Sequence, residues 1–335
     1  MNSIVSAVVA KLPYTRKLQN ALVRGPLDKV FTQRYKRLQL TRANEMPTLE
    51  TLELRNVFNA IQEKGIFITS LDDLPKIFGI QSSSSQNLLN AMDGKIATLP
   101  SQDKNASTGM GRFISLDQLI EHQIITWPLN SKLYDLMENY FALKPAFVGP
   151  FFSRSYPNGE ITGVRRTHVD TDDRRMLRAF IYLNDLDENS GPFRYLDKSQ
   201  TQVIRDSMLS WWPKSFTDQD LAKLGIQKDD WKLVTGERGT VIFADTSQIA
   251  HSASLPTEGY RDMLTFLFAS ERPHLPVYLR GGLSINEKYL QRATSTIETE
   301  LNGDPNLSRY VDSVNWARGL NPFVRALSGF DIHSN

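Results

Sequence analysis

A block of short strand-like segments separated by turn signals constrains this chain more than any other feature. The candidate strands are Ala146–Tyr156, Gly163–Val169, Leu177–Asn184, Phe193–Leu196, Thr240–Phe243 and Met263–Ala269. Between them lie turn sequences such as Pro157-Asn158-Gly159 and Asn189-Ser190-Gly191-Pro192. Gly, Asn and Pro favour the backbone angles of tight turns. The pattern therefore predicts a β-roll of two sheets.

Helical patterns flank this block on both sides. Apolar residues recur at helical spacing before Gly65, over residues 129–143 and again from about residue 285. We expect a basic helical arm over 1–47, a mainly β domain over 48–275 and a helical extension over 276–335. The domain is predicted to be α+β, with a double-stranded β-helix (jelly roll) core.

Two insertions interrupt the predicted domain, near residues 80–112 and 203–231. The first is rich in Ser, Gln, Asn and Gly, including Ser82 to Ser85, so we expect a long loop there. The second is expected to contain a helix capped by Thr217.

The composition excludes several classes of function. The 335 residues include no cysteine, which excludes disulfides, thiolate metal sites and a cysteine nucleophile. A net charge of +2 gives no sign of nucleic-acid binding. No apolar stretch approaches the roughly 18 residues that span a bilayer. We therefore expect a cytoplasmic protein. Because the chain has no cysteine, any bound metal must be held by imidazole and oxygen ligands.

Three residues in the strand block form a candidate metal site. His168-Val169-Asp170 ends a predicted strand, where residues i and i+2 point to the same face. His251 follows the strand Thr240–Phe243, so a neighbouring strand could deliver a third ligand. Two imidazoles and one carboxylate on one face of an octahedron leave three open positions, which is typical of non-haem Fe(II) oxygenases.

An arginine at a fixed distance from the last histidine strengthens this interpretation. Arg261 lies ten residues after His251, on a strand where Met263 and Thr265 share its face. A planar guanidinium suits bidentate carboxylate binding. Arg261 could hold the far carboxylate of a 2-oxo diacid whose other end binds the metal. The alternative is an ordinary ion pair with Asp262 or Glu258.

A second strand face carries further candidates. Arg178, Phe180, Tyr182 and Asn184 alternate along one predicted strand. If this face points inward, Arg178, Tyr182 and Asn184 could contact a cosubstrate. The alternative for Tyr182 is core packing. Asp245 and Thr246 are expected to stabilise the turn that leads to His251.

Two segments resemble the phytanoyl-CoA dioxygenase-like branch of the Fe(II)/2-oxoglutarate oxygenases. They are Arg178–Arg194, with its Asn-Ser-Gly-Pro turn, and Gly239–His251, which reads Gly-Thr-Val-Ile-Phe-Ala-Asp-Thr before the distal histidine. The resemblance covers residues 146–272. It implies that His168, Asp170 and His251 bind iron and that Arg261 binds 2-oxoglutarate.

The resemblance also implies the reaction. Fe(II), 2-oxoglutarate and O₂ together would hydroxylate or desaturate a small molecule, while 2-oxoglutarate loses CO₂ to become succinate. The chain departs from the family where some relatives carry a serine two residues after the arginine. Met263 stands there, so Thr265 is our candidate for the second contact to the distal carboxylate.

Other functions and the choice of substrate stay open at this point. The chain could be a cupin-like protein that binds a metal without turnover, or an oxygenase that modifies a protein, although such oxygenases commonly have lysine at the place of Arg261. Five arginines crowd the His168 region and could recognise an anionic substrate or pair with aspartates: Arg165, Arg166, Arg174, Arg175 and Arg178. The C-terminal helices could pair in a homodimer.

Overall fold

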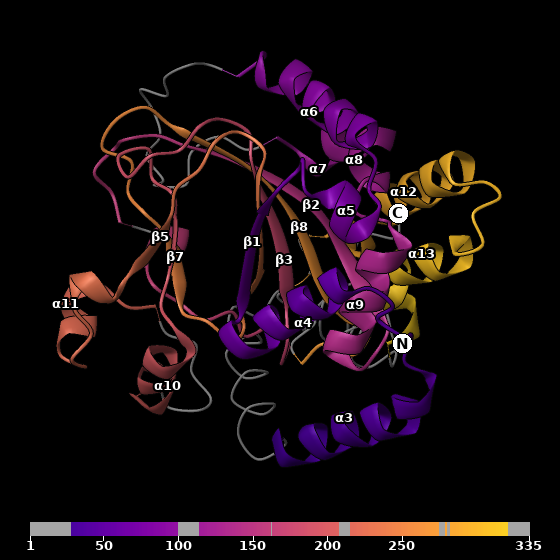
Figure 1. Cartoon of the computed structure of the whole chain (residues 1–335), viewed down its shortest axis with the longest axis horizontal. Helices are drawn as coiled ribbons and strands as arrows, with labels where there is room; N and C mark the ends of the chain where they lie inside the picture. The colour runs from indigo at the N-terminus through magenta and orange to yellow at the C-terminus, as the bar shows by residue number, and fades with distance from the viewer. Residues whose placement is uncertain are drawn as a thin grey trace, which may run out of the picture.

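Two antiparallel sheets form the centre of the molecule (Figure 1). The computed structural model describes residues 28–99, 114–161, 163–207, 215–274, 279 and 282–320. The larger sheet has the order β1-β6-β3-β8-β2 and the smaller one β5-β4-β7. The strands are β1 (Ile66–Ser70), β2 (Pro145–Ser155), β3 (Leu177–Tyr182), β4 (Phe193–Tyr195), β5 (Lys232–Val234), β6 (Thr240–Asp245), β7 (His251–Ala253) and β8 (Arg261–Ser270).

Helices precede, interrupt and follow the strands. The α-helices are α3 (Asp28–Arg42), α4 (Leu52–Lys64), α5 (Leu74–Phe78), α6 (Ser82–Ile96), α7 (Leu116–Leu119), α8 (His122–Thr126), α9 (Ser131–Phe141), α10 (Lys198–Ser207), α11 (Asp218–Ala222), α12 (Glu287–Glu300) and α13 (Leu307–Val314). Short 3₁₀ turns lie at η1 (Ala43–Glu45), η2 (Gly163–Arg165), η3 (Lys228–Asp230), η5 (Leu283–Ile285) and η6 (Trp316–Gly319). No helix among the described residues is long and apolar enough to cross a membrane.

The larger sheet has one face covered by helices and one that faces the smaller sheet. Because side chains alternate along a strand, Leu264, Phe266 and Phe268 of β8 point to the helices, where Trp127 stacks on Phe266 at 5.3 Å between ring centroids. We call this the outer face. Figure 1 shows α4, α9 and α13 on this side and the smaller sheet on the other.

A second apolar cluster fills part of the space between the two sheets. Phe180 and Tyr182 of β3 meet Phe193 and Tyr195 of β4 there. We call the side of the larger sheet that points into this space the inner face. The fold is therefore α+β with two facing antiparallel sheets, as expected, while closure into a jelly roll stays a prediction.

Most predicted elements are present, two expectations were wrong, and two short strands were not predicted. The expected loop at 80–112 contains the helix α6, because Leu88 and Met92 lie four residues apart and are fully buried. Gly163–Val169 is not a strand, because it pairs with other segments only through isolated bridges at Thr167 and His168. The short strands β5 and β7 were not anticipated. Residues 1–27, 100–113 and 208–214 of the arm and insertions lie outside the described residues.

Gly65 shows how the fold connects a helix end to the candidate site. It ends α4 in the left-handed region, at φ 80°. A Cβ at this position would lie 2.5 Å from Cγ2 of Ile249, two residues before His251. Glycine therefore satisfies both the backbone angle and the close packing against the segment that carries the histidine.

Candidate functional site

The three candidate ligands converge at the edge of the smaller sheet. His251 is the first residue of β7, and His168 pairs with it through an isolated antiparallel bridge. The backbone N–H of His168 donates to the carbonyl of His251 at 3.1 Å, and the return bond measures 3.0 Å. The loop at Asp170 is held by its own N–H, which donates to the Thr246 carbonyl at 2.9 Å. Backbone pairing thus replaces the predicted strand end in bringing the triad together.

Both imidazoles present Nε2 to the same point. Nδ1 of His168 lies 2.8 Å from the Arg166 carbonyl, and Nδ1 of His251 lies 3.2 Å from the Ile249 carbonyl. A carbonyl oxygen can only accept, so each Nδ1 carries the hydrogen and each Nε2 keeps its lone pair. Donor atoms of the triad all lie within 4.8 Å of one another. The triad can therefore hold a metal ion.

Arg178 orients the carboxylate of the triad. Its Nε and Nη2 donate to Oδ2 of Asp170 at 3.0 and 2.8 Å, while Oδ1 lies 3.6 Å from Nε2 of His168. Burial by itself would raise the pKa of Asp170, but the charged Arg178 guanidinium beside it holds this pKa well below its ordinary value. Asp170 is thus an anion with one oxygen held and one available to a metal.

The electrostatics of His251 also suit a ligand. Burial, and then the neighbouring His168, lower the pKa of His251 to about 3. The ring is therefore neutral at physiological pH, and a neutral imidazole is the form that binds metals.

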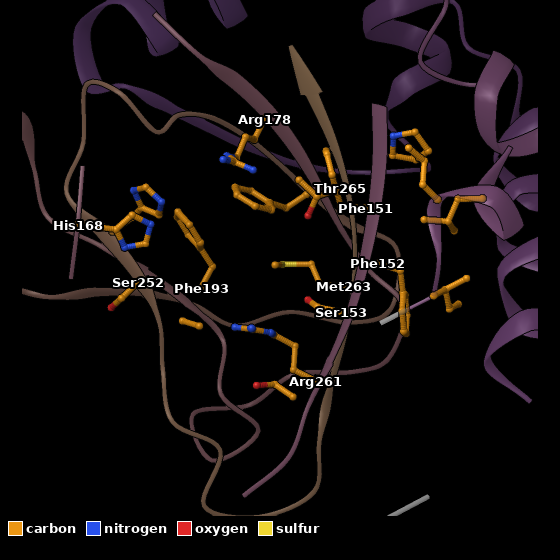
Figure 2. A pocket seen from close by; sticks show the side chains of 18 residues that line it. Phe151, Phe152, Ser153, His168, Arg178, Phe193, Ser252, Arg261, Met263 and Thr265 are labelled. Atoms are coloured by element: carbon orange, nitrogen blue, oxygen red, sulfur yellow. The ribbon is translucent and has the colours of Figure 1, made fainter. Parts of the chain in front are cut away.

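The two histidines of the triad line a cavity of about 420 Å³ between the two sheets (Figure 2). This volume lies in the ordinary range of small-molecule sites, roughly 300–1,000 Å³. Its walls come from both sheets and from the segment around α7. The lining residues are Ile114, Leu116, Leu119, Pro150, Phe151, Phe152, Ser153, Ser155, His168, Arg178, Phe180, Phe193, His251, Ser252, Ala253, Arg261, Met263 and Thr265.

Arg261 enters this cavity as a buried charge without an acidic partner. It is only 2 % exposed, its Nη1 donates to the Gly191 carbonyl at 2.9 Å, and its Nε has no partner. No acidic side chain of the described residues forms an ion pair with it. Burial lowers the pKa of Arg261 to about 10, so it stays charged at neutral pH. An unpaired buried charge costs several kcal/mol, which an anionic ligand could offset.

Asp262, the first alternative partner of Arg261, is already paired. Successive side chains on β8 point to opposite faces, so Asp262 lies on the outer face. There Arg154 of β2 binds it with two hydrogen bonds of 2.6 Å each. The bidentate pair leaves Arg261 as the only one of these three charges without a counterion.

The structure separates the remaining predicted site residues. Thr265 lines the cavity, but four residues of strand place it ~13 Å from Arg261, too far to contact the same carboxylate. Tyr182 is fully buried and does not line the cavity; its hydroxyl donates to the Val234 carbonyl and accepts from the Phe193 N–H. Asn184 lies beyond β3 and bonds to the backbone of Tyr260 and Asp262. The Tyr182 hydroxyl and the Asn184 side-chain amide therefore hold backbone segments together.

Asp245 serves the turn before His251, as expected. Its Oδ1 accepts from the backbone N–H groups of Met176 and Ser247 at 3.2 and 2.9 Å, and its Oδ2 accepts from the Tyr140 hydroxyl at 2.6 Å. These bonds fix the end of β6 and thereby the path to β7.

Two serines at the Arg261 end were missed, and Arg165 was named only as one of five arginines near His168, not as a residue of this end. Ser155 is paired with Arg261 across β2 and β8, and Ser153 with Met263. Arg165 donates from Nη2 to Ser155 Oγ at 3.0 Å and is 1 % exposed. The alternation Phe151, Ser153, Ser155 within a predicted strand was the available signal. The contact between Arg165 and Ser155 had no sequence signal, because it depends on the loop after β2.

Comparisons with known proteins give only distant likenesses. No family model matches the chain, and no curated protein matches it. Among solved structures, the non-heme alpha ketoglutarate dependent epimerase SnoN from nogalamycin biosynthesis, in complex with Fe³⁺ and alpha ketoglutarate, is 14% identical with TM-score 0.44, over 68% of this chain and 88% of that chain. HygX from Streptomyces hygroscopicus with nickel and 2-oxoglutarate is 12% identical with TM-score 0.42, over 64% and 87%. These likenesses are too low to decide function, which rests on the site itself.

Proposed function

We propose that the chain is a non-haem Fe(II)/2-oxoglutarate-dependent oxygenase that hydroxylates or desaturates a small molecule. The observation that carries this proposal is that one cavity is lined by the two histidines of a two-histidine, one-carboxylate triad and by a buried arginine without an acidic partner. In Figure 2, His168 and the guanidinium of Arg261 point into the same space. A site that binds a metal ion through the triad and a small dianion through Arg261 accounts for both features.

The residues present divide into two binding functions. His168, Asp170 and His251 would hold Fe(II), which with O₂ and 2-oxoglutarate supplies the oxidising chemistry. Arg261 would bind the distal carboxylate of 2-oxoglutarate, with Ser155 as a neighbouring hydroxyl. Arg178 would keep Asp170 in place without touching the reacting atoms.

The charge balance of the cavity supports a dianionic cosubstrate. A guanidinium anchors one carboxylate, and a divalent ion on a triad with one carboxylate keeps a net positive charge for the other end. A cupin-like protein that only binds metal would have no use for the unpaired charge of Arg261. The described residues offer no comparable argument for a protein substrate, so we rank that alternative lower.

Succinate release tests the proposal directly. Purified protein, reconstituted with Fe(II) in air, should convert 2-oxoglutarate to succinate, and Arg261→Gln should reduce this conversion at least ~100-fold, because a buried charge-assisted pair is lost. Arg238→Gln is the matched control, since Arg238 is exposed and bound to Asp93. Titration of 2-oxoglutarate into the Zn(II)-loaded protein measures binding separately from turnover. Metal binding with neither 2-oxoglutarate binding nor succinate would favour the cupin-like alternative.

A further inference from the structure

We infer that the substrate half of the cavity takes an uncharged, largely apolar small molecule, oriented by one hydrogen bond to Thr265. This inference rests on the proposed function for the place of 2-oxoglutarate. It concerns the part of the cavity that lies away from Arg261, which we call the substrate half.

The walls of the substrate half are aromatic and aliphatic. Phe151 of β2 and Phe180 of β3 flank Thr265 in one row across the inner face, because both are paired with it in the sheet register. Phe193 closes the row from the smaller sheet, at 5.0 Å between ring centroids from Phe180. Apolar side chains from the α7 segment complete the walls: Ile114, Leu116 and Leu119.

Neither charged side chain of the cavity lies unpaired in the substrate half. Of the described lining residues only Arg178 and Arg261 carry a fixed charge. Arg178 is bound to Asp170. Arg261 is the first residue of β8 and lies ~13 Å along the strand from Thr265. A charged group in the substrate half would lose its water without gaining a partner, which costs several kcal/mol.

The arginine cluster near His168 does not supply such a partner. Arg165 is bound to Ser155 and to the backbone around it, and Arg166 donates to the Ile161 carbonyl. Arg174 and Arg175 lie over the rings of Tyr35 and Tyr140, and neither is among the residues that line the cavity. Only Arg178 of the five lines the cavity, and it is bound to Asp170, which favours the alternative that these arginines pair within the protein.

Thr265 offers a hydroxyl that could orient a substrate on the apolar surface of the substrate half. It is 6 % exposed and lines the cavity, and its hydroxyl lies in a row whose neighbours are both phenylalanines. A hydroxyl or carbonyl of an otherwise apolar molecule could bond there, while the rings contact its hydrocarbon part. Small-molecule sites commonly fix the orientation of the ligand with a few polar groups in a mostly apolar wall.

A matched pair of probes tests the charge preference. We would titrate 4-phenylbutan-1-ol and 4-phenylbutanoate into the Zn(II)-loaded protein by calorimetry, with saturating 2-oxoglutarate to occupy Arg261. The alcohol should bind at least ~10-fold more tightly than the carboxylate, since a buried unpaired charge is costly. Equal or tighter binding of the carboxylate would overturn the inference.

Variants locate the binding. Phe151→Gln and, independently, Leu116→Gln should weaken the alcohol at least ~10-fold and leave 2-oxoglutarate binding intact. Thr265→Val should weaken the alcohol about 3- to 10-fold but leave butylbenzene unchanged, because it removes one hydrogen bond. Leu233→Gln, at an exposed position on β5, is the control. If neither Phe151→Gln nor Leu116→Gln affects the alcohol, the inference is wrong.

The two proposals fail in different ways. If 2-oxoglutarate does not bind, the proposed function fails, and the probe comparison is repeated in Arg261→Gln, where the carboxylate has no anchor. If 2-oxoglutarate binds and the alcohol does not, only the assignment of an apolar substrate fails.

Discussion

The two faces of the five-stranded sheet differ in how completely their side chains are satisfied. On the outer face, Phe266 stacks on Trp127 and the Arg154–Asp262 pair closes with two short hydrogen bonds. Arg261 is the neighbour of Asp262 on β8, and its side chain lies on the inner face. There its buried Nε has no partner. The outer face is therefore built for stability, and the inner face keeps binding capacity at some cost to stability.

Strand alternation makes this division possible. Neighbouring residues on β8 belong to different environments, because their side chains point to opposite sides of the sheet. One strand can thus carry a structural ion pair and, next to it, the arginine that we propose as a ligand anchor. The following variants test whether the two faces are as independent as this suggests.

Removing a metal ligand opposite the inner face, on β7 of the smaller sheet, should have the largest effect. His251→Ala should weaken metal binding by more than the ~100-fold that loss of an outer partner costs, and should abolish succinate formation. Equilibrium dialysis with Zn(II) measures the affinity. Unchanged affinity would remove His251 from the metal site.

A deletion on the outer face should act on stability. Phe266→Ala should cost about 3–5 kcal/mol of unfolding free energy, because it leaves a cavity in the packed helix layer. Urea denaturation of the metal-free protein measures it. Metal affinity of the folded variant should stay within about twofold of the original, and a large loss of affinity would show that the faces are coupled.

The two buried arginines of β2 and β8 should respond in opposite directions. Arg154→Met leaves Asp262 uncompensated and should cost about 3–5 kcal/mol. Arg261→Met removes an unpaired buried charge and should leave the unfolding free energy unchanged or higher. Denaturant midpoints of the two ligand-free variants give the comparison. Equal destabilisation would mean that Arg261 is also a structural residue.

Loss of the carboxylate support should give an intermediate effect. Arg178→Gln should lower metal affinity about 10–100-fold, as loss of an outer partner does, while succinate formation recovers when excess Fe(II) is supplied. Dialysis against Zn(II) at several concentrations measures it. The exposed Arg238→Gln serves again as the control, and no change in affinity would assign Arg178 to another role.

One buried carboxylate near the end of β8 should make stability depend on pH. Burial raises the pKa of Asp173 to about 7, and its Oδ2 accepts from the Ser270 N–H at 2.8 Å. The folded state therefore binds the proton more tightly than the unfolded chain. This stability is fully present below about pH 4 and is lost as pH rises through 7, with a slope of about 1 kcal/mol per unit. Unfolding free energies at about pH 5 and 8 should converge in Asp173→Asn; a persistent slope would assign it to other groups.

Local patterns were sufficient for most of the elements. Alternation predicted the long strands, and helical spacing with Gly65 predicted α4. The capping residue Thr217 was also right, since its side chain accepts from the Asp220 N–H at the start of α11. Failures occurred where local signals were weak. Polar composition hid α6, whose stability comes from burial of Leu88 and Met92, and three-residue strands such as β7 are too short to show a period.

Residue types and spacing by themselves predicted that His168, Asp170 and His251 come together and that Arg261 shares a strand face with Met263 and Thr265, because chemistry and strand alternation are properties of the chain. Only the tertiary structure decided what each group touches. Asp262 pairs with Arg154, and Arg178 binds Asp170. Tyr182 and Asn184 form hydrogen bonds with the backbone. Thr265 lies in an apolar row ~13 Å from Arg261. These outcomes depend on segments far apart in sequence, whose approach is set by sheet register and packing.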